Sequence, residues 1–414
     1  MSNGKSVSLS DAREARRRLA SEYRKEKADK AHDVDGFVHG GEGQILKGNL
    51  DNIHIALEKL GVSLRLNQFS VMAHITGLDG YGPILNDSIA TRLRHLIHET
   101  FKFLPTRELF EETLDDIALV NAFHPVREYL DGLKWDGWKR LSSWLPHYLG
   151  SEESEYIELV GKSFFISMVA RIYSPGCKQD HMMILEGPQG ALKSMACGVI
   201  AGEWFSDSLP DVRDAKDCSQ HLQGKWLIEV GELSAMSKAE TTTLKAFITR
   251  QTERYRPSYG RREVVQPRQC VFVGTTNADC YLKDATGGRR FWPVKCGSIE
   301  VEKLRADRDQ LFAEAVHLFK AGAHWWPDRD FEIKHIKPEQ DARFVVDPWQ
   351  EKISEFIQGR ERVTVWQLAR DALFIETARV APRDSSRITE VLTAINWKRH
   401  RSNGVTWYIP KVKM

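Results

Sequence analysis

The sequence lacks any apolar run of about 18 or more residues, the length that a membrane-spanning helix needs. Residues 1–30 also lack the apolar core of a secretory signal. None of the six cysteines forms a C-x-x-C pair, and no nearby histidines complete a zinc-type spacing. These absences argue against a membrane-spanning, secreted or zinc-binding protein, and we expect reduced thiols in a cytoplasmic one.

Charge of one sign is not in excess either, because the formal net charge is only +2. This balance does not by itself indicate a nucleic-acid-binding protein, so such evidence has to come from local patches. Residues 1–45 are poor in large apolar groups and hold several arginines near the start. We expect a flexible basic arm, which either contacts DNA phosphates or is merely solvated.

Residues 46–175 carry apolar residues at helical spacing, as in LDNIHIALEKLG with its terminal glycine. We therefore predict a helical domain over this range. Tryptophan and tyrosine recur at intervals of three to six residues between Val126 and Leu149. We assign these aromatic residues to the hydrophobic core rather than to base stacking.

Residues 176–325 differ, because short apolar runs alternate there with turns and helical patterns. The runs are HMMILEG, GKWLIEVGEL, RQCVFVGTTN and RRFWPVKCG. Buried strands separated by helices are typical of a parallel sheet that is covered on both faces. The predicted fold class is therefore an α/β core, and residues 301–322 should form the amphipathic helix that closes it.

Residues 345–414 predict a third domain. Three helical patterns precede two apolar runs that turn at Ser402-Asn403-Gly404, and Asn-Gly between such runs is a strong hairpin signal. Three helices and a hairpin indicate a winged-helix-like domain. The basic run from Lys398 to Arg401 is expected between the third helix and the hairpin, where it serves either DNA or a protein contact.

A phosphate-binding pattern follows the first strand of the α/β core. Its residues are Gly187, Pro188, Gln189, Gly190, Ala191, Leu192, Lys193 and Ser194. Between a strand and a helix, such glycines let backbone N–H groups wrap phosphates at the helix N-terminus. Lys193 is then predicted to reach the β- and γ-phosphates of ATP, and Ser194 to bind Mg²⁺.

Leu192 departs from this pattern, which usually has glycine just before the lysine. The substitution leaves open how closely the first helical turn approaches the phosphates. On this segment alone, an ordinary strand–turn–helix with a chance Lys-Ser pair remains the alternative.

Polar residues end the next two strands of the core. Glu229 and Glu232 follow an apolar run, and Asn277 ends the strand CVFVGTT. A carboxylate at a strand end holds Mg²⁺ in P-loop proteins, and another orients the attacking water. We assign the metal to Glu229 and the base to Glu232, although the reverse assignment is nearly as good. Asn277 is predicted to bond the γ-phosphate or the water.

Arginines mark two further segments. Arg289 and Arg290 follow two glycines and precede a strand, where they either stabilise phosphoryl charge at a neighbouring subunit or form a surface ion pair. The second segment, residues 245–268, is the local basic patch. Its charged residues are Lys245, Arg250, Arg254, Arg256, Arg261, Arg262 and Arg268 against Glu253 and Glu263, with Tyr255 and Tyr259 between them.

These segments, in this order, resemble the virulence-associated protein E family. That family is itself similar to the superfamily 3 helicases of phages and small viruses, which belong to the AAA+ ATPases. The resemblance covers roughly residues 50–300. It rests on His124-Pro125-Val126-Arg127-Glu128-Tyr129-Leu130 with Trp135-Asp136-Gly137, on Gly187 to Ser194, on Glu229 to Leu233, on Arg254-Tyr255-Arg256-Pro257 with Tyr259-Gly260-Arg261, on Gly274 to Asn277, and on Thr286 to Pro293.

The resemblance implies an AAA+-like P-loop core that assembles as a ring, expected to be a hexamer, around single-stranded or forked DNA, with ATP sites between subunits. In superfamily 3 enzymes a hairpin at this place in the order grips the DNA backbone. By resemblance, the DNA contacts are Arg254, Arg256, Tyr259, Arg261 and Arg262. Some relatives carry a primase-like domain ahead of this region, but only about 45 residues precede it here, so no primase activity is expected.

The predicted function is an ATP-dependent DNA helicase or translocase that replicates a phage or mobile element in the cytoplasm of a bacterial host. A first alternative is a nucleotide-gated initiator or loader that melts or marks an origin without processive unwinding. Slow hydrolysis caused by Leu192 would favour it. A second alternative is a P-loop switch that does not act on DNA and uses its basic residues only for assembly.

Overall fold

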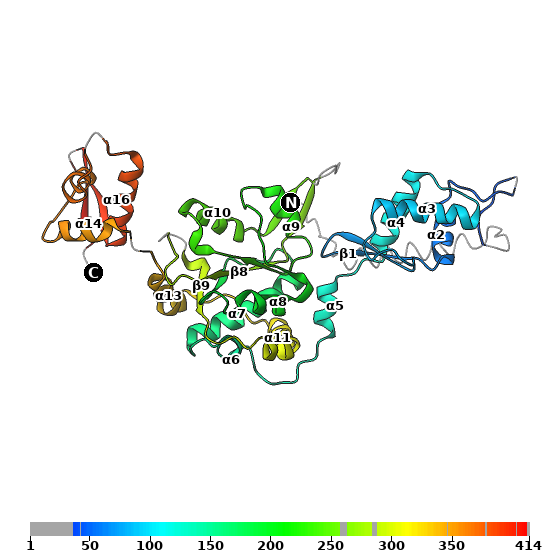
Figure 1. Ribbon diagram of the computed structural model, residues 1–414, viewed down its shortest axis with the longest axis horizontal. Coiled ribbons are helices and arrows are strands. Elements are labelled where there is room, and N and C mark those ends of the chain that lie inside the picture. Colours follow the sequence, from blue (N-terminus) through cyan, green and yellow to red (C-terminus); the bar gives the residue numbers. More distant parts are fainter. Residues whose placement is uncertain are drawn as a thin grey trace, which may run out of the picture.

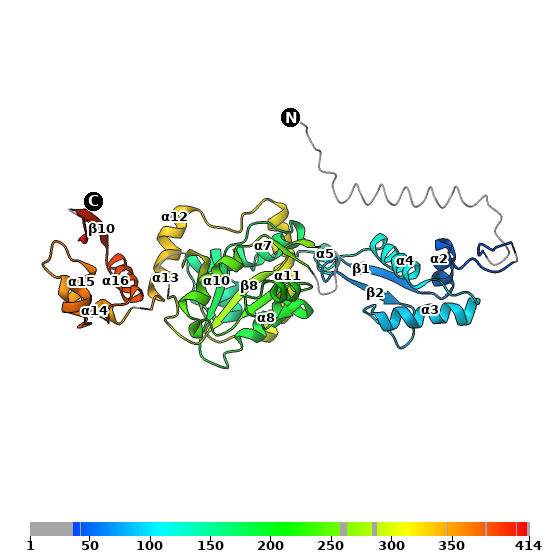
Figure 2. The same cartoon turned by 90° about the horizontal axis from the view of Figure 1, so that it is seen from above.

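The computed structural model describes residues 36–41, 43–256, 263–283, 288–345, 347–376, 379–402 and 404–411. They form an N-terminal, a central and a C-terminal lobe that follow one another along the molecule (Figures 1 and 2). Each lobe has its own hydrophobic core, and the central one has a core on each face of its sheet. Within the described ranges, no helix combines the length and apolar character needed to cross a membrane.

The N-terminal lobe combines helices with a two-stranded antiparallel sheet. Its elements are α2 (Leu50–Lys59), β1 (Ser63–Asn67), β2 (Met72–Thr76), α3 (Asp87–Phe101) and α4 (Arg107–Val120). The range 46–175 is therefore not purely helical, because β1 and β2 pair within it. Leu64 and Ile75 lie opposite each other in this pair, and both are buried in the lobe's core.

Three further helices of the range 46–175 contribute to the core of the central lobe. They are α5 (Pro125–Gly132), α6 (Trp144–Leu149) and α7 (Glu155–Tyr173). Trp144 and Tyr148 are buried in the same cluster as the strand residues, which confirms the assignment of these aromatics to the core. Trp138 contradicts that assignment, because it is 74% exposed. The core thus crosses the domain boundary predicted at residue 175.

The central lobe is built on a parallel sheet, as the sequence predicts, with β4 (Phe205–Ser206) as a fifth strand beside the four predicted ones. Its other strands are β3 (Met182–Glu186), β5 (Leu227–Val230), β8 (Val271–Thr276) and β9 (Phe291–Lys295). Their order across the sheet is β4-β5-β8-β3-β9, and every neighbouring pair is parallel. All five carboxyl ends therefore meet at one edge.

Helices cover both faces of this sheet, because successive strand residues point to opposite sides and are apolar on each. Met183 and Leu185 pack with α7, α8 (Lys193–Ala201) and α11 (Val301–Lys320). Met182 and Ile184 face α9 (Ala215–His221) and α10 (Lys238–Ile248) on the other side, and Figure 1 shows these two groups of helices on either side of β8. Helix α11 confirms the helix predicted over residues 301–322.

Shorter elements connect the main ones. A second antiparallel pair joins β6 (Thr252–Tyr255) and β7 (Val264–Pro267). The remaining elements of this lobe are η1 (Gly202–Trp204), η2 (Leu233–Ala235), η3 (Gly288–Arg290), α12 (Arg329–Phe331), η4 (Glu332–Ile336) and α13 (Lys337–Ala342). Ser237 and Glu240 form the capping box at the start of α10.

The C-terminal lobe has helices followed by a hairpin. Its elements are α14 (Trp349–Ile357), α15 (Val365–Gln367) continued by η5 (Leu368–Ala372), α16 (Pro382–Ala394), β10 (Trp397–Ser402) and β11 (Val405–Pro410). Residues 398–401 were expected between the third helix and the hairpin. They instead lie within β10, the first strand of the hairpin, and are exposed. The helix–hairpin order agrees with the sequence, while the winged-helix assignment remains a prediction.

Candidate functional site

A loop at the carboxyl edge of the sheet connects β3 to α8. It begins after Glu186 and ends at Leu192, because β3 stops and α8 starts at those points. Gly190 has a φ of +81°, which glycine adopts without steric cost. Pro188, Gln189 and Gly190 are exposed, whereas Lys193 is only 7% exposed. The structure therefore has the strand–loop–helix order that phosphate binding requires.

Leu192 takes the left-handed conformation, with φ 62° and ψ 20°. That conformation costs roughly 1–2 kcal/mol for a residue with a Cβ atom, which explains why glycine is usual here. The Leu192 side chain is 44% exposed and lies on the wall of a cavity of about 580 Å³. The leucine thus preserves the backbone geometry and leaves the cavity open.

Lys193 ties the loop to the end of a neighbouring strand. Its Nζ atom donates hydrogen bonds to the carbonyl oxygens of Gly187 at 2.7 Å and Pro188 at 2.9 Å, and to Asn277 Oδ1 at 3.0 Å. Burial lowers the pKa of Lys193 below its ordinary value. The amine therefore lies inside the curve of the loop, next to the polar end of β8.

Glu229 is the buried carboxylate of the site. Ser194 Oγ donates to Glu229 Oε1 at 2.7 Å, and Thr275 Oγ1 donates to the same oxygen at 2.6 Å. The other oxygen, Oε2, is buried and has no hydrogen-bond partner among the described residues. Buried carboxylate oxygens without partners are rare, so this atom points to a ligand such as a cation. The sequence did not single out Thr275, although it precedes Asn277 by only two residues.

The remaining predicted residues at this edge line the same cavity. Glu232 and Asn277 are exposed, and Glu232 has a φ of 53°. The cavity is lined by residues 189–195, by Glu229, Gly231, Glu232, Ser234 and Ala235, and by residues 275–277. The structure therefore brings Lys193, Ser194, Glu229 and Asn277 together, as the sequence predicts, with Glu232 on the same wall.

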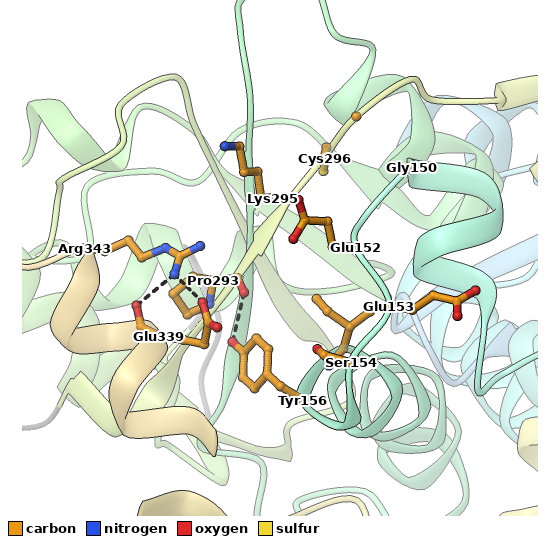
Figure 3. Close-up of a pocket in the computed structure, with 12 residues that line it drawn as sticks. Gly150, Glu152, Glu153, Ser154, Tyr156, Pro293, Lys295, Cys296, Glu339 and Arg343 are labelled. Atoms are coloured by element: carbon orange, nitrogen blue, oxygen red, sulfur yellow. Dashed lines mark hydrogen bonds and ion pairs between the residues drawn. The ribbon is translucent and has the colours of Figure 1, made fainter. Parts of the chain in front are cut away.

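A second cavity, of about 420 Å³, lies on the β9 side of the loop (Figure 3). Cys296 lines this cavity and lies next to the start of the loop, because its backbone N–H donates to the carbonyl oxygen of Glu186 at 2.8 Å. Figure 3 shows Glu152, Lys295 and Arg343 around the space, together with Tyr156, whose hydroxyl donates to the carbonyl oxygen of Pro293 at 2.9 Å. The two cavities flank the loop at the same edge of the sheet.

Arg343 anchors the wall of the second cavity to β3. Its Nε and Nη2 atoms donate to the carboxylate of Glu186 at 2.9 and 3.0 Å, and the pair is largely buried. Tyr281 donates to the same carboxylate at 2.8 Å, and Glu339 is a further partner of Arg343. Sequence reasoning missed this cluster, because its members are far apart along the chain and belong to none of the motifs.

Arg289 and Arg290 lie at the opposite edge of the sheet from the loop. They precede β9, and Phe291 at its start is paired with Met182 at the start of β3. Lys193 instead follows the far end of β3. The two arginines therefore do not reach the β3–α8 loop of their own chain, as the prediction of a role at a neighbouring subunit requires.

The β6–β7 hairpin occupies the position predicted for a DNA-gripping element. Arg254 is exposed and Arg256 follows it, while Tyr259, Arg261 and Arg262 lie outside the described residues. Along β6, Glu253 and Tyr255 face inward and Thr252 and Arg254 outward, which is the two-residue alternation of a strand.

Part of the predicted basic patch is buried and does not face a ligand. Arg268 is 2% exposed and donates to Glu253 Oε1 at 2.9 Å and to the carbonyl oxygen of Phe247 at 2.7 Å. Lys245 is 5% exposed and lies over the ring of Phe291. Tyr255 is buried with its hydroxyl against Gln223. Arg268 ties the base of the hairpin together through Glu253, because a buried charge needs a nearby partner.

The fold and this site define a mixed α/β protein with a central parallel sheet and a candidate ligand site at its carboxyl edge. Residues 130–345 match the virulence-associated protein E-like domain. Because this match covers more than half of the chain, the chain belongs to that family.

Solved structures of the NrS-1 C-terminal region are distantly similar. Two A-form apo structures of this region are each 13% identical to the present chain. The first match covers 88% of the present chain and 100% of the NrS-1 chain, with a TM-score of 0.45. The second covers 86% of the present chain and 98% of the NrS-1 chain, with a TM-score of 0.42. A further apo structure has 15% identity, 87% and 98% coverage and a TM-score of 0.40. A comparison with curated proteins finds no match.

Proposed function

We propose that the chain is an ATP-dependent motor on DNA, a helicase or translocase in the replication of a phage or mobile element. The convergence of Lys193, Ser194, Glu229 and Asn277 at one edge of a parallel sheet carries this proposal. Ligands of such sheets bind at the carboxyl ends of the strands. The family membership agrees with a role in mobile elements.

The phosphates belong in the 580 Å³ cavity, where Lys193 is the one cation among the described lining residues. Its Nζ atom now bonds loop carbonyls and Asn277 and would exchange these bonds for phosphate oxygens. The N-terminus of α8 adds backbone N–H groups that favour an anion. Asn277 is then positioned to bond the γ-phosphate or the attacking water.

The residues present fit a magnesium ion. The unpaired Oε2 atom of Glu229 and the hydroxyl of Ser194 are oxygen ligands of the kind that Mg²⁺ prefers, and they lie together. When bound, Mg²⁺ neutralises charge on the β- and γ-phosphates. Glu232, exposed on the same wall, is left to act as the base that orients and deprotonates water.

The nucleoside belongs in the 420 Å³ cavity on the β9 side. This cavity adjoins the first residue of the loop and holds carboxylates, among them Glu152 and Glu153, that accept hydrogen bonds from ribose hydroxyls or an exocyclic amine. A nucleotide that spans both cavities passes over Gly187, which lies next to Cys296.

Arg289 is assigned to the γ-phosphate of a neighbouring subunit in a ring. Mixing two inactive variants tests this role. Arg289→Ala alone should lower ATP turnover at least about a thousandfold, since arginines of this type contribute about 10³–10⁵. Adding the Lys193→Ala variant should restore activity, because its intact Arg289 then serves the neighbour's intact loop. Turnover is measured as phosphate release from saturating ATP.

The control for this mixture is Arg305→Ala, a charge removal on the exposed face of α11. This variant should keep full ATP turnover by itself. Mixed with Lys193→Ala, it should show only the lower turnover expected from dilution of active subunits. A mixture of Arg289→Ala and Lys193→Ala that stays inactive, although both proteins co-assemble, would exclude a role across the interface.

The outer face of the hairpin is assigned to the DNA backbone. Replacing Arg254 and Arg256 together with alanine should weaken single-stranded DNA binding and reduce the slope of log affinity against log salt by about 1.4, since each phosphate neutralised on a single strand contributes about 0.7. Fluorescence anisotropy at several salt concentrations measures both quantities. Arg305→Ala is again the control. An unchanged slope would move the DNA site away from this hairpin.

Two assays separate the three candidate functions. ATP hydrolysis stimulated by single-stranded DNA is expected for a motor and for a loader, but not for a switch that does not act on DNA. Strand displacement on forked DNA then distinguishes the motor from the loader. The positive φ of Leu192, which preserves the loop backbone, favours the motor.

A further inference from the structure

A third cavity, of about 290 Å³, lies at the edge of the sheet where β3 and β9 begin. Its wall comes from three segments, residues 178–181 ahead of β3, Arg289 and Arg290 ahead of β9, and residues 325–327 with Glu332 after α11. Because β3 and β9 are parallel, the full length of both strands separates this cavity from the phosphate loop. It is therefore a separate site on the same chain.

Several polar atoms of this wall have no hydrogen-bond partner among the described residues, although they are buried. They are Gln179 Oε1, Asp180 Oδ1, His181 Nδ1 and Arg290 Nε. Buried polar atoms are nearly always paired, so four such atoms around one cavity point to a ligand. The Gln179 residue is only 7% exposed. Together they offer acceptors and a donor, which suits a ligand with both kinds of group.

The geometry of His181 supports this interpretation. Its ring stacks on Trp292 at 4.1 Å between centroids with an interplanar angle of 17°, so the ring is held in one orientation. Burial lowers the pKa of His181 to about 4. The imidazole is therefore neutral at neutral pH, and its Nδ1 atom can bond an uncharged part of a ligand.

Aromatic and cationic groups complete the wall. Trp326 is 46% exposed, and its ring lies 4.8 Å from that of Trp325, which donates from Nε1 to the carbonyl oxygen of Lys178 at 2.9 Å. Lys178, Arg289 and Arg290 outnumber the carboxylates of Asp180 and Glu332 among the lining residues. The site thus offers a flat apolar face beside an excess of positive charge.

We propose that this cavity binds a single nucleotide, with the base against Trp326 and among the unpaired polar atoms, and the phosphate on Arg290. Base edges carry the mixed donors and acceptors that Gln179, Asp180 and Arg290 leave unpaired, and any base stacks on an indole. An acidic peptide would use the arginines but would leave Asp180 facing another carboxylate. The nucleotide is either free or part of a single strand, and these sources share the chemistry.

The Lys193→Ala variant isolates this site, because it removes the amine from the phosphate loop. Deoxynucleoside monophosphates and a ten-residue oligothymidylate are titrated against it by calorimetry. We expect binding at one site per chain. Trp326→Ala as a second change should weaken it about tenfold or more, since a base–aromatic stack contributes about that factor. Arg290→Ala should also weaken it, because it removes the cation assigned to the phosphate. Trp326→Phe should restore the affinity that Trp326→Ala removes, which separates stacking from misfolding.

The controls assign the source of the nucleotide. Binding of monophosphates supports a free nucleotide, whereas binding of the oligothymidylate alone, still sensitive to Trp326→Ala when Arg254 and Arg256 are replaced, supports a strand. Arg305→Ala should have no effect. The proposal is overturned by absent binding, by binding insensitive to Trp326→Ala, or by an oligoglutamate that binds instead in an Arg290-dependent way. Arg289 borders both proposed sites, but Trp326 and Arg290 are the residues changed in this test and neither lies in the loop after β3, so the proposed ATPase stands or falls separately.

Discussion

Replacing Lys193 with alanine is expected to lower ATP turnover at least about a hundredfold, the usual cost of removing one preorganised donor from an anion site. The reason is local, because Lys193 is the one cation among the described residues that line the 580 Å³ cavity, whose lining also holds Glu229 and Glu232. Without this positive charge, the negative charge of the nucleotide phosphates would be repelled by the carboxylates of the cavity. Phosphate release at saturating ATP and Mg²⁺ measures the effect.

Two further variants make this test specific. Lys303→Ala removes an exposed lysine of α11 and should leave turnover unchanged. Lys193→Arg keeps the charge but not the compact ammonium that fits between three acceptors, so it should also be severely impaired. Near-normal turnover in Lys193→Ala, with thermal unfolding like that of the wild type, would refute the phosphate assignment.

Glu229→Gln is expected to lower turnover at least about a hundredfold and to remove the magnesium dependence of nucleotide binding. Glutamine keeps an oxygen for the hydroxyls of Ser194 and Thr275, so the fold should survive. It replaces the unpaired Oε2 atom with an amide that cannot bind a cation. Nucleotide titrations with and without Mg²⁺, beside phosphate release, separate binding from chemistry.

Glu232→Gln is the matched variant, because Glu232 lies on the same wall but is exposed and has no bond to Ser194 among the described contacts. It should lose turnover and keep magnesium-dependent binding, as expected for a base. If Glu232→Gln instead loses the magnesium dependence while Glu229→Gln keeps it, the two roles are exchanged.

The central sheet and its loop could be predicted because their signals are local. Strands buried on both faces are apolar at every position, as in Met182 to Leu185, and they stand out between helical patterns. The glycine-containing loop and the polar strand ends follow these runs directly. Since parallel strands bring their carboxyl ends to one edge, strand order along the chain was enough to bring Lys193, Glu229 and Asn277 together.

Burial of charge could not be predicted in the same way. Arg268 and Lys245 read as parts of a basic surface, but their position is decided by Glu253, Phe247 and Phe291, whose proximity the sequence does not reveal. The β1–β2 pair was missed because it is stabilised by the facing Leu64 and Ile75, which lie on separate segments of the sequence. Such features depend on contacts between segments, which periodicity does not encode.

The buried ion pair between Arg343 and Glu186 has a mechanical consequence. Glu186 is the last residue before the phosphate loop, and Arg343 lies four positions before Asp347, which holds Arg387 of α16 at 2.7 Å. Separating such a pair leaves a buried charge without a partner, which costs about 3–5 kcal/mol. A displacement of Glu186 is therefore expected to move Arg343, and with it the end of α13, which couples the start of the loop to a helix distant in the sequence.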